Sequence, residues 1–175
     1  MAAPPCPQPN DNSVLSGFIT PATDTPAPNS FAGSITASVI DSSENEPVRI
    51  LEAADSFTIR VDWCICGQVI QALAGCWNVK LYINHIDGIA GPTSGQLGPT
   101  KTVQVDSVPL QNVPVEGFQR CYSLPFDFPG NTVVPGVYSL VAVVTLFTIS
   151  CANPGPQEGD LLGYAQIPVL VFYVD

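Results

Sequence analysis

The sequence predicts an all-β fold, an antiparallel sandwich of about seven to nine short strands. Segments rich in Val, Ile, Tyr, Phe and Thr recur along the chain, and turn residues separate them. Gly and Pro account for 14 and 18 of the 175 residues and are scattered without a period. No stretch shows the apolar periodicity of an amphipathic helix. Together these observations favour a sandwich over a helical or mixed architecture.

Residues 1–30 are predicted to form a Pro-rich N-terminal arm, and residues 31–175 are assigned to the β-sandwich domain. The first segment places seven prolines among Asn, Asp, Ser and Thr. Such a composition cannot bury enough apolar surface to fold alone, and it favours extended conformations. The arm is interpreted either as a linker or as a segment that lies along a neighbouring subunit.

Four strands are predicted in the first half of the sandwich, at residues 35–40, 48–53, 56–66 and 77–85. The two longer segments alternate cleanly between apolar and other residues, which is the pattern of a half-buried strand. Their inward faces are expected to carry Phe57, Ile59, Val61, Trp63 and Ile65 in one strand, and Trp77, Val79, Leu81 and Ile83 in the other.

A long glycine-rich loop is predicted at residues 86–100, before shorter strands at 102–105 and 121–126. Lys101 follows this loop, but Thr100 rather than glycine precedes it, so the segment lacks the pattern of a phosphate-binding P-loop. A second loop is predicted at residues 150–160. Both are interpreted as connections that could also form a ligand surface at one end of the sandwich.

The most strand-like segment has the sequence PGVYSLVAVVTLFTI and covers residues 135–149. Both of its alternating faces are apolar, so we expect it to be covered on both sides at the middle of a sheet. We expect Val141 and Val143 to lie on a buried face. One face carries Val137, Val141, Val143 and Phe147, and the other carries Tyr138, Leu140, Ala142, Val144 and Leu146.

The final strand is predicted at residues 163–174 and carries no charge before Asp175. Edge strands of soluble monomers usually carry charges that block pairing. The first interpretation is a central strand covered on both faces. The alternative is a strand that pairs or packs against another subunit, with a candidate interface formed by Ile167, Val169, Val171 and Tyr173.

The segment PGVYSLVAVV resembles the penultimate strand of immunoglobulin-like and fibronectin-III-like sandwiches, in which a Gly-x-Tyr pattern opens the strand. The resemblance rests on Gly136 and on Tyr138 to Val144, and Trp77 is similar to the core tryptophan of such folds. It implies an immunoglobulin-like sandwich for residues 31–175 and no particular function. The paired core cysteines of antibody domains are not evident, because Cys64 and Cys66 fall on the face opposite Trp63.

The chain has six cysteines, and disulfides are the favoured interpretation. Bridges are suggested between Cys64 or Cys66 and Cys76, and between Cys121 and Cys151, with at least one expected to involve Cys76. Free buried thiols are one alternative. Another is a metal site formed by Cys64, Cys66, Cys76 and His85, although C-x-C suits zinc less well than C-x-x-C. We expect neither a metal nor another cofactor. The candidate disulfide cysteines are Cys64, Cys66, Cys76, Cys121 and Cys151.

No catalytic residue is predicted. His85 is the only histidine, and it lies at a predicted strand end without an identifiable nucleophile. Neither Gly-x-Ser-x-Gly nor His-Glu-x-x-His occurs. Acidic residues in predicted loops match no EF-hand spacing and are interpreted as solvated charge; they are Asp41, Glu44, Glu46, Glu158 and Asp160.

Net charge limits the partners of this chain. It is −10 with only five Lys and Arg residues, which argues against nucleic-acid binding and against attraction to an anionic membrane. No apolar run approaches the roughly 20 residues of a membrane-spanning helix. The start of the sequence lacks the pattern of a secretory signal, so we expect a cytoplasmic protein or export by a non-classical route.

The low charge fraction, the arm and the uncharged final strand predict a non-enzymatic structural or assembly subunit. We expect it to associate with itself or another protein through strand edges and the arm, as a homo-oligomer or filament. The alternative is a ligand- or protein-binding module that uses the loops at residues 86–100 and 150–160. A hydrolytic or metal-dependent enzyme is the least favoured function.

Overall fold

The computed structural model describes residues 15–19, 32–42, 47–86, 94–113, 117–147 and 161–175. In these ranges the chain forms eleven strands and two short 3-10 segments, and no helix long and apolar enough to span a membrane occurs there. The strands are β1 Leu15–Ile19, β2 Ala32–Asp41, β3 Ile50–Glu52, β4 Phe57–Gly67, β5 Cys76–His85, β6 Gly95–Gln96, β7 Lys101–Gln104, β8 Gln111–Val113, β9 Gly117–Phe128, β10 Gly136–Phe147 and β11 Leu161–Tyr173.

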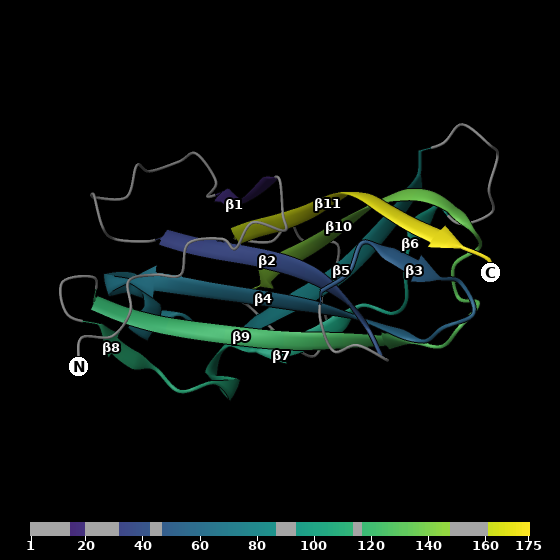
Figure 1. Cartoon of the computed structure of the whole chain (residues 1–175). Helices are drawn as coiled ribbons and strands as arrows, with labels where there is room; N and C mark the ends of the chain where they lie inside the picture. The colour runs from purple at the N-terminus through teal and green to yellow at the C-terminus, as the bar shows by residue number, and fades with distance from the viewer. Residues whose placement is uncertain (1–14, 20–31, 43–46, 87–93, 114–116, 148–160) are drawn as a thin grey trace.

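Two sheets pack face to face (Figure 1). The larger, seven-stranded sheet has the order β1-β11-β10-β5-β6, with β3 also paired to β11 and β7 to β5. The smaller, four-stranded sheet has the order β2-β4-β9-β8. Every strand pair in the described ranges is antiparallel except β3 with β11. The fold is an immunoglobulin-like β-sandwich, as the sequence predicted.

The strands agree closely with the predicted segments. Eight of those described have four residues or more, within the predicted number, and the short strands β3, β6 and β8 account for the other three. The strand at Leu15–Ile19 was not predicted, because it lies within the segment assigned to the N-terminal arm. It pairs antiparallel with β11, and the rest of the predicted arm lies outside the described residues.

The core lies between the two sheets and contains the inward faces predicted from alternation. Every residue assigned to those faces in β4 and β5 is at most 3% exposed. At its centre, the Trp63 ring stacks on Tyr122 with centroids 4.9 Å apart, and Trp77 meets both rings edge-on. Such aromatic pairs stabilise a core beyond their burial by about 0.5–1.5 kcal/mol.

Strand β10 lies between β11 and β5, so its predicted place at the middle of a sheet is confirmed. The phenol of Tyr138 donates a 2.9 Å hydrogen bond to the carbonyl oxygen of Val134, four residues upstream. This is the tyrosine corner of immunoglobulin-like sandwiches, and it agrees with the resemblance of this segment to their penultimate strand. Trp77, the other residue of that resemblance, is fully buried.

The predicted burial of Val141 and Val143 is wrong. Their neighbours Leu140, Ala142 and Val144 are fully buried between the sheets, so Val141 and Val143 point to the outer face, where they are half-buried. Alternation separates the two faces of a strand, but it does not tell which apolar face meets the other sheet.

The sandwich is closed along one side by contacts from the segment around β7. The Lys101 ammonium donates a hydrogen bond to the carbonyl oxygen of Pro125 and lies 4.7 Å from the centroid of the Phe126 ring. The Val105 carbonyl oxygen accepts hydrogen bonds from Tyr122 Oη at 2.7 Å and Arg120 Nη1 at 2.9 Å. These contacts join the larger sheet to β9 of the smaller one, and they give Lys101 a structural role.

Candidate interaction surface

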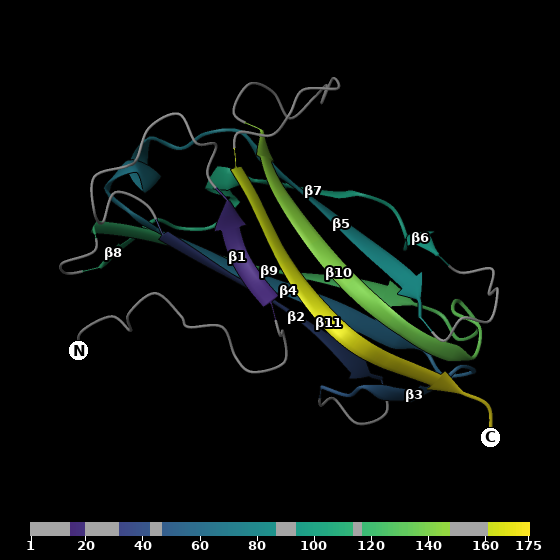
Figure 2. The same ribbon diagram turned by 90° about the horizontal axis from the view of Figure 1, so that it is seen from above.

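The outer face of the seven-stranded sheet carries a contiguous group of apolar and aromatic side chains. It lies over β5, β10 and β11, whose outer sides face the viewer in Figure 2. All of these side chains are half-buried or exposed, with Tyr82 at 38% and Leu162 at 36% exposure. We define the outer apolar patch as Tyr82, Val137, Val141, Val143, Leu162, Tyr164 and Val171.

Strand register brings these residues together from distant parts of the chain. Val143 pairs with Lys80 on one side and Tyr164 on the other, so these three side chains form a row across the sheet. In the next row, Val141 lies between Tyr82 and Gln166. The two central rows therefore bring together two valines and two tyrosines from three adjacent strands, with Lys80 at the end of one row and Gln166 at the opposite end of the other.

Polar uncharged side chains surround this centre. Thr145 pairs with Asn78, whose side chain accepts a 2.9 Å hydrogen bond from Thr102. Ser139 pairs with Asn84 near the other end of β10. An apolar, aromatic centre within a polar rim is the usual anatomy of a protein–protein interface.

The outer face of the four-stranded sheet has a different character. Arg60 and Asp62 form an exposed ion pair with a 2.9 Å distance between Nε and Oδ2. Thr58 donates a 2.8 Å hydrogen bond to Asp127 across the strands. This is the polar outer face expected of a solvated antiparallel sheet. Other polar residues at outward positions there are Ser34, Thr36, Ser38 and Ser123.

The strands that form the patch contain no acidic residue. The chain has 15 Asp and Glu residues, yet β5, β10 and β11 contain none and carry one lysine, Lys80. Lys80 forms no ion pair with any residue in the described ranges. The strands that form the patch are thus depleted of negative charge relative to this acidic chain as a whole.

The candidate interface on the final strand is not one face of β11. A register shift between β10 and β11 interrupts the alternation at Pro168. As a result Ile167 points into the core and is 3% exposed, whereas Val169 and Tyr173 are 45% and 43% exposed. Val171 is half-buried on the outer face. Ile167 is therefore a core residue, and contact of Val169, Val171 and Tyr173 with a partner stays a prediction.

Strands of the same chain occupy both ends of the β11 edge. Strand β1 pairs with Leu162 to Gln166, and β3 pairs with Val171 to Tyr173. The final strand is thus a central strand, as the first interpretation expected, but only its inner face is covered, because Leu162, Val169 and Tyr173 are exposed on the other side. Another subunit cannot pair with β11 at these positions without displacing β1 or β3.

The prediction of a disulfide is confirmed, and so is the expectation that Cys76 takes part in one, but the suggested partners of Cys64 and Cys121 are wrong. Cys64 is bonded to Cys121, its register partner across β4 and β9, with Cα atoms 4.1 Å apart. This excludes the predicted pairs of Cys64 with Cys76 and of Cys121 with Cys151. Cys66 and Cys76 are also disulfide-bonded. Cys151 lies outside the described residues.

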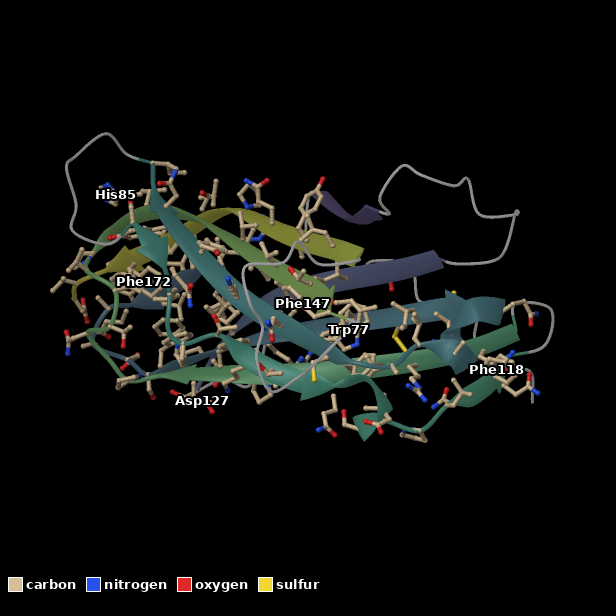
Figure 3. All side chains as sticks on the ribbon, turned by 180° about the vertical axis from the view of Figure 1, so that it is seen from behind. Trp77, His85, Phe118, Asp127, Phe147 and Phe172 are labelled. Atoms are coloured by element: carbon tan, nitrogen blue, oxygen red, sulfur yellow. A yellow bond between two sulfur atoms is a disulfide. The ribbon has the colours of Figure 1, made fainter. Side chains whose placement is uncertain are left out.

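The cysteine and histidine side chains considered for a metal site do not come together. His85 and Trp77, the neighbour of Cys76, lie toward opposite ends of β5 in Figure 3. The His85 ring packs edge-on against Tyr138, with centroids 4.8 Å apart. The three cysteines of that set are disulfide-bonded. In the described ranges no group of three His, Cys, Asp or Glu side chains could hold a metal ion.

The two predicted loops begin from opposite ends of the larger sheet. The first follows His85, which pairs with Tyr138 near the start of β10. The second lies between Phe147 and Leu161, at the other end of β10. Nine residues of extended strand separate these ends by about 30 Å. Residues 87–93 and 148–160 lie outside the described residues, and the placement of the flanking strands does not support one joint ligand surface.

A small cavity of about 220 Å³ lies between β2 and β11, close to β3. It is smaller than the roughly 300–1,000 Å³ of most small-molecule sites. Neither its size nor its lining indicates a particular ligand. Its lining residues are Ser38, Val39, Pro47, Val48, Arg49 and Ile167.

Neither a protein-family model nor a curated protein matches this sequence. Among solved structures, the chain is similar to the CARDB domain of a Pyrococcus furiosus protein in complex with di-metal ions. The two share 14% identity with a TM-score of 0.43, over 82% of this chain and 96% of that one.

The chain is also similar to two β-glucosidases. One is from Erythrobacter marinus, with 17% identity and a TM-score of 0.43 over 82% of this chain. The other is from Listeria innocua, in complex with glucose, with 12% identity and a TM-score of 0.37 over 83% of this chain. This chain spans only 15% and 17% of the length of these enzymes. Identities and TM-scores this low carry no conclusion about activity or ligands.

Proposed function

We propose that this chain is a non-enzymatic structural or assembly subunit that associates with itself or with another protein through the outer apolar patch. The observation that carries this proposal is the contrast between the two outer faces. One has a valine and tyrosine centre without acidic residues, and the other has the hydroxyl and charged side chains of a solvated sheet.

Burial of the patch would contribute favourable free energy to association. Each fully buried Val or Tyr side chain adds on the order of 1.5–3 kcal/mol before the entropic cost of association is subtracted. Tyrosine also loses little conformational entropy when it is immobilised, which is why it is enriched in interfaces. The patch replaces the strand edges in the sequence-based proposal, because β1 and β3 already pair with β11.

The proposal includes no catalytic role, and the uses of the reactive side chains support this part of it. The described cysteines are bonded in disulfides. The His85 ring packs against Tyr138. Lys101 joins the two sheets. Each of these groups has a structural explanation in the fold.

The proposal is tested by the mass of the chain in solution, with two lysine variants as matched probes. Val143→Lys places a charge at the centre of the patch, where a half-buried outward side chain can extend its ammonium into water. Thr36→Lys makes a comparable change on the outer face of the smaller sheet. Thermal melts establish that both variants fold.

Light scattering at about 1–200 µM then compares the three proteins. We expect the average mass of the wild type and of Thr36→Lys to increase above 18.5 kDa as the concentration increases. The mass of Val143→Lys should remain that of one chain. Equal association of Val143→Lys and the wild type would contradict the patch as the interface. A wild type that stays at 18.5 kDa would contradict self-association.

A further inference from the structure

We infer that the occupant of the outer apolar patch is a second copy of this chain, related by a two-fold axis that runs along β10 at Val143. This inference rests on the proposed function and specifies the partner and its orientation. Sheet-on-sheet packing of this kind buries the central side chains of both copies at once.

The size of the patch fits such a dimer. Strands about 4.8 Å apart that rise about 3.3 Å per residue give the three strands β5, β10 and β11 a flat area of about 550 Å². Side-chain relief raises the accessible area above that value. A stable protein interface buries about 800 Å² per partner, so two copies of this face supply the area that a dimer needs.

Charge also favours a second copy. Two chains of net charge −10 repel each other wherever their acidic surfaces meet. The strands β5, β10 and β11 contain no Asp or Glu, so contact through the patch keeps the acidic residues of both chains out of the interface. Of the two outer sheet faces that the structure describes, the patch is the one without Asp62 and Asp127, so like-charge repulsion between copies is lower there.

The row formed by Lys80, Val143 and Tyr164 selects the orientation. A two-fold axis along β10 exchanges the two sides of the row, so Lys80 of each copy faces Tyr164 of the other across the interface. An ammonium over a tyrosine ring is a favourable cation–π contact. An axis across the strands would instead place Lys80 opposite Lys80, where two like charges repel. The axis along β10 therefore gives Lys80 a partner that it lacks among the charged groups of residues 15–19, 32–42, 47–86, 94–113, 117–147 and 161–175.

Cross-linking of variants that each gain one cysteine tests this geometry. The four native cysteines in the described ranges are bonded in disulfides, so they do not compete with the new thiol. Lys80→Cys and Tyr164→Cys are prepared as separate proteins, and each protein alone and a mixture of the two are treated with a bismaleimide. The spacer of the reagent is about 10 Å, the distance between packed sheets. The mixture should form a covalent species of twice the chain mass. Neither variant alone should form it to a comparable extent.

The outcomes separate this inference from the proposed function. Cross-linking of Lys80→Cys alone, without a gain on mixing, would place the axis across the strands and overturn the inference while leaving the patch as the interface. A wild type that stays monomeric also overturns it, because no second copy then binds. Association that Val143→Lys leaves unchanged would overturn both the inference and the patch.

A second measurement examines Lys80 without a cross-linker. Lys80→Met removes the charge and keeps a long side chain, so we expect the dimer dissociation constant to rise about tenfold through the loss of two cation–π contacts. Lys80→Arg should restore it to within about threefold, because a guanidinium also stacks on tyrosine. Arg60→Met on the opposite sheet is the matched control and should leave the constant unchanged. A dissociation constant for Lys80→Met within twofold of the wild type would contradict the orientation.

Discussion

The phenolic hydroxyl of Tyr122 donates a 2.7 Å hydrogen bond to the carbonyl oxygen of Val105, and through it β9 contacts the 3-10 segment that follows β7. The same tyrosine ring stacks on Trp63 in the core. Tyr122 thus takes part both in the packing between the sheets and in the closure of one side of the sandwich.

Tyr122→Phe should reduce the free energy of unfolding by about 0.5–1.5 kcal/mol, the net value of one hydrogen bond. The loss stays small because Arg120 still donates to the Val105 carbonyl oxygen and because the ring is retained. Urea melts at pH 7 measure it. Tyr173→Phe, at an exposed tyrosine, should change stability by less than about 0.5 kcal/mol. Equal effects of the two variants would show that the Tyr122 hydroxyl contributes nothing to stability.

Alkaline pH should destabilise the fold through the same residue. Burial raises the pKa of Tyr122 above its ordinary value of 10.0, despite opposing contributions from Trp77 and Arg120. Below pH 10 the phenol is protonated in both states, so its full contribution to stability is present. As pH rises above that value the unfolded chain releases the proton first, and stability is lost up to the raised pKa of the folded state.

Urea melts of the wild type and Tyr122→Phe between pH 8 and pH 11 check this dependence. The wild type should lose more stability above pH 10 than the variant, and the difference between them should be constant below pH 9. All other residues are the same in the two proteins, so the comparison isolates the Tyr122 hydroxyl. Parallel pH profiles throughout the range would mean that Tyr122 ionises equally easily in the folded and unfolded states.

Two adjacent aspartate substitutions test which face of β10 meets the core. Val144 is fully buried and faces the other sheet. Val144→Asp therefore buries a carboxylate without a partner and should lower the free energy of unfolding by about 4 kcal/mol or more. Val143→Asp points outward and should cost about 1–2 kcal/mol. Gln96→Ala, at an exposed side chain that contacts Gly98 and Thr100, should cost less than about 0.5 kcal/mol.

Melts of these variants are performed at about 1 µM, where association through the patch contributes least. The account requires the order Val144→Asp, Val143→Asp, Gln96→Ala from most to least destabilised. A larger loss for Val143→Asp than for Val144→Asp would reverse the assignment of the two faces.

The bond between Cys64 and Cys121 should contribute strongly to stability. It joins residues 57 positions apart, and chain entropy predicts about 4 kcal/mol for a loop of that length. The variant with serine at both positions avoids a free thiol and should unfold at a correspondingly lower urea concentration. A change below about 1 kcal/mol would indicate that the bond restricts the unfolded chain far less than its loop length predicts.

Much of the fold could be predicted because alternation with a period of two is clear in β4 and β5. Phe57, Trp63 and Trp77 lie on the predicted faces and are buried. The Gly-x-Tyr pattern at Tyr138 likewise anticipated the start of β10, to which the structure adds the hydrogen bond from Tyr138 to the preceding turn.

Two features could not be derived from alternation. In β10 both faces are apolar, so the pattern does not tell whether Val143 or Val144 meets the other sheet. In β11 the irregularity at Pro168 shifts the phase by one residue, and Ile167 moves to the core. A one-residue shift moves every later side chain to the opposite face.

Contacts between strands that are distant in the sequence could not be predicted either. The pairing of Cys64 with Cys121 depends on the register of β4 and β9, which no local pattern specifies. The outer apolar patch depends in the same way on Tyr82, Val143 and Tyr164 meeting from three strands. One signal for it was present, since the three segments that form its strands contain no Asp or Glu in an acidic chain.

The most direct test of the proposed surface is hydroxyl-radical footprinting of the wild type across its association range. Tyr82 and Tyr164 should be labelled at about 1 µM and become protected as the mass increases. Exposed Leu110, outside the patch, should keep a constant rate of labelling. An increase in mass with no protection of Tyr82 and Tyr164 would show that this chain associates through a different surface.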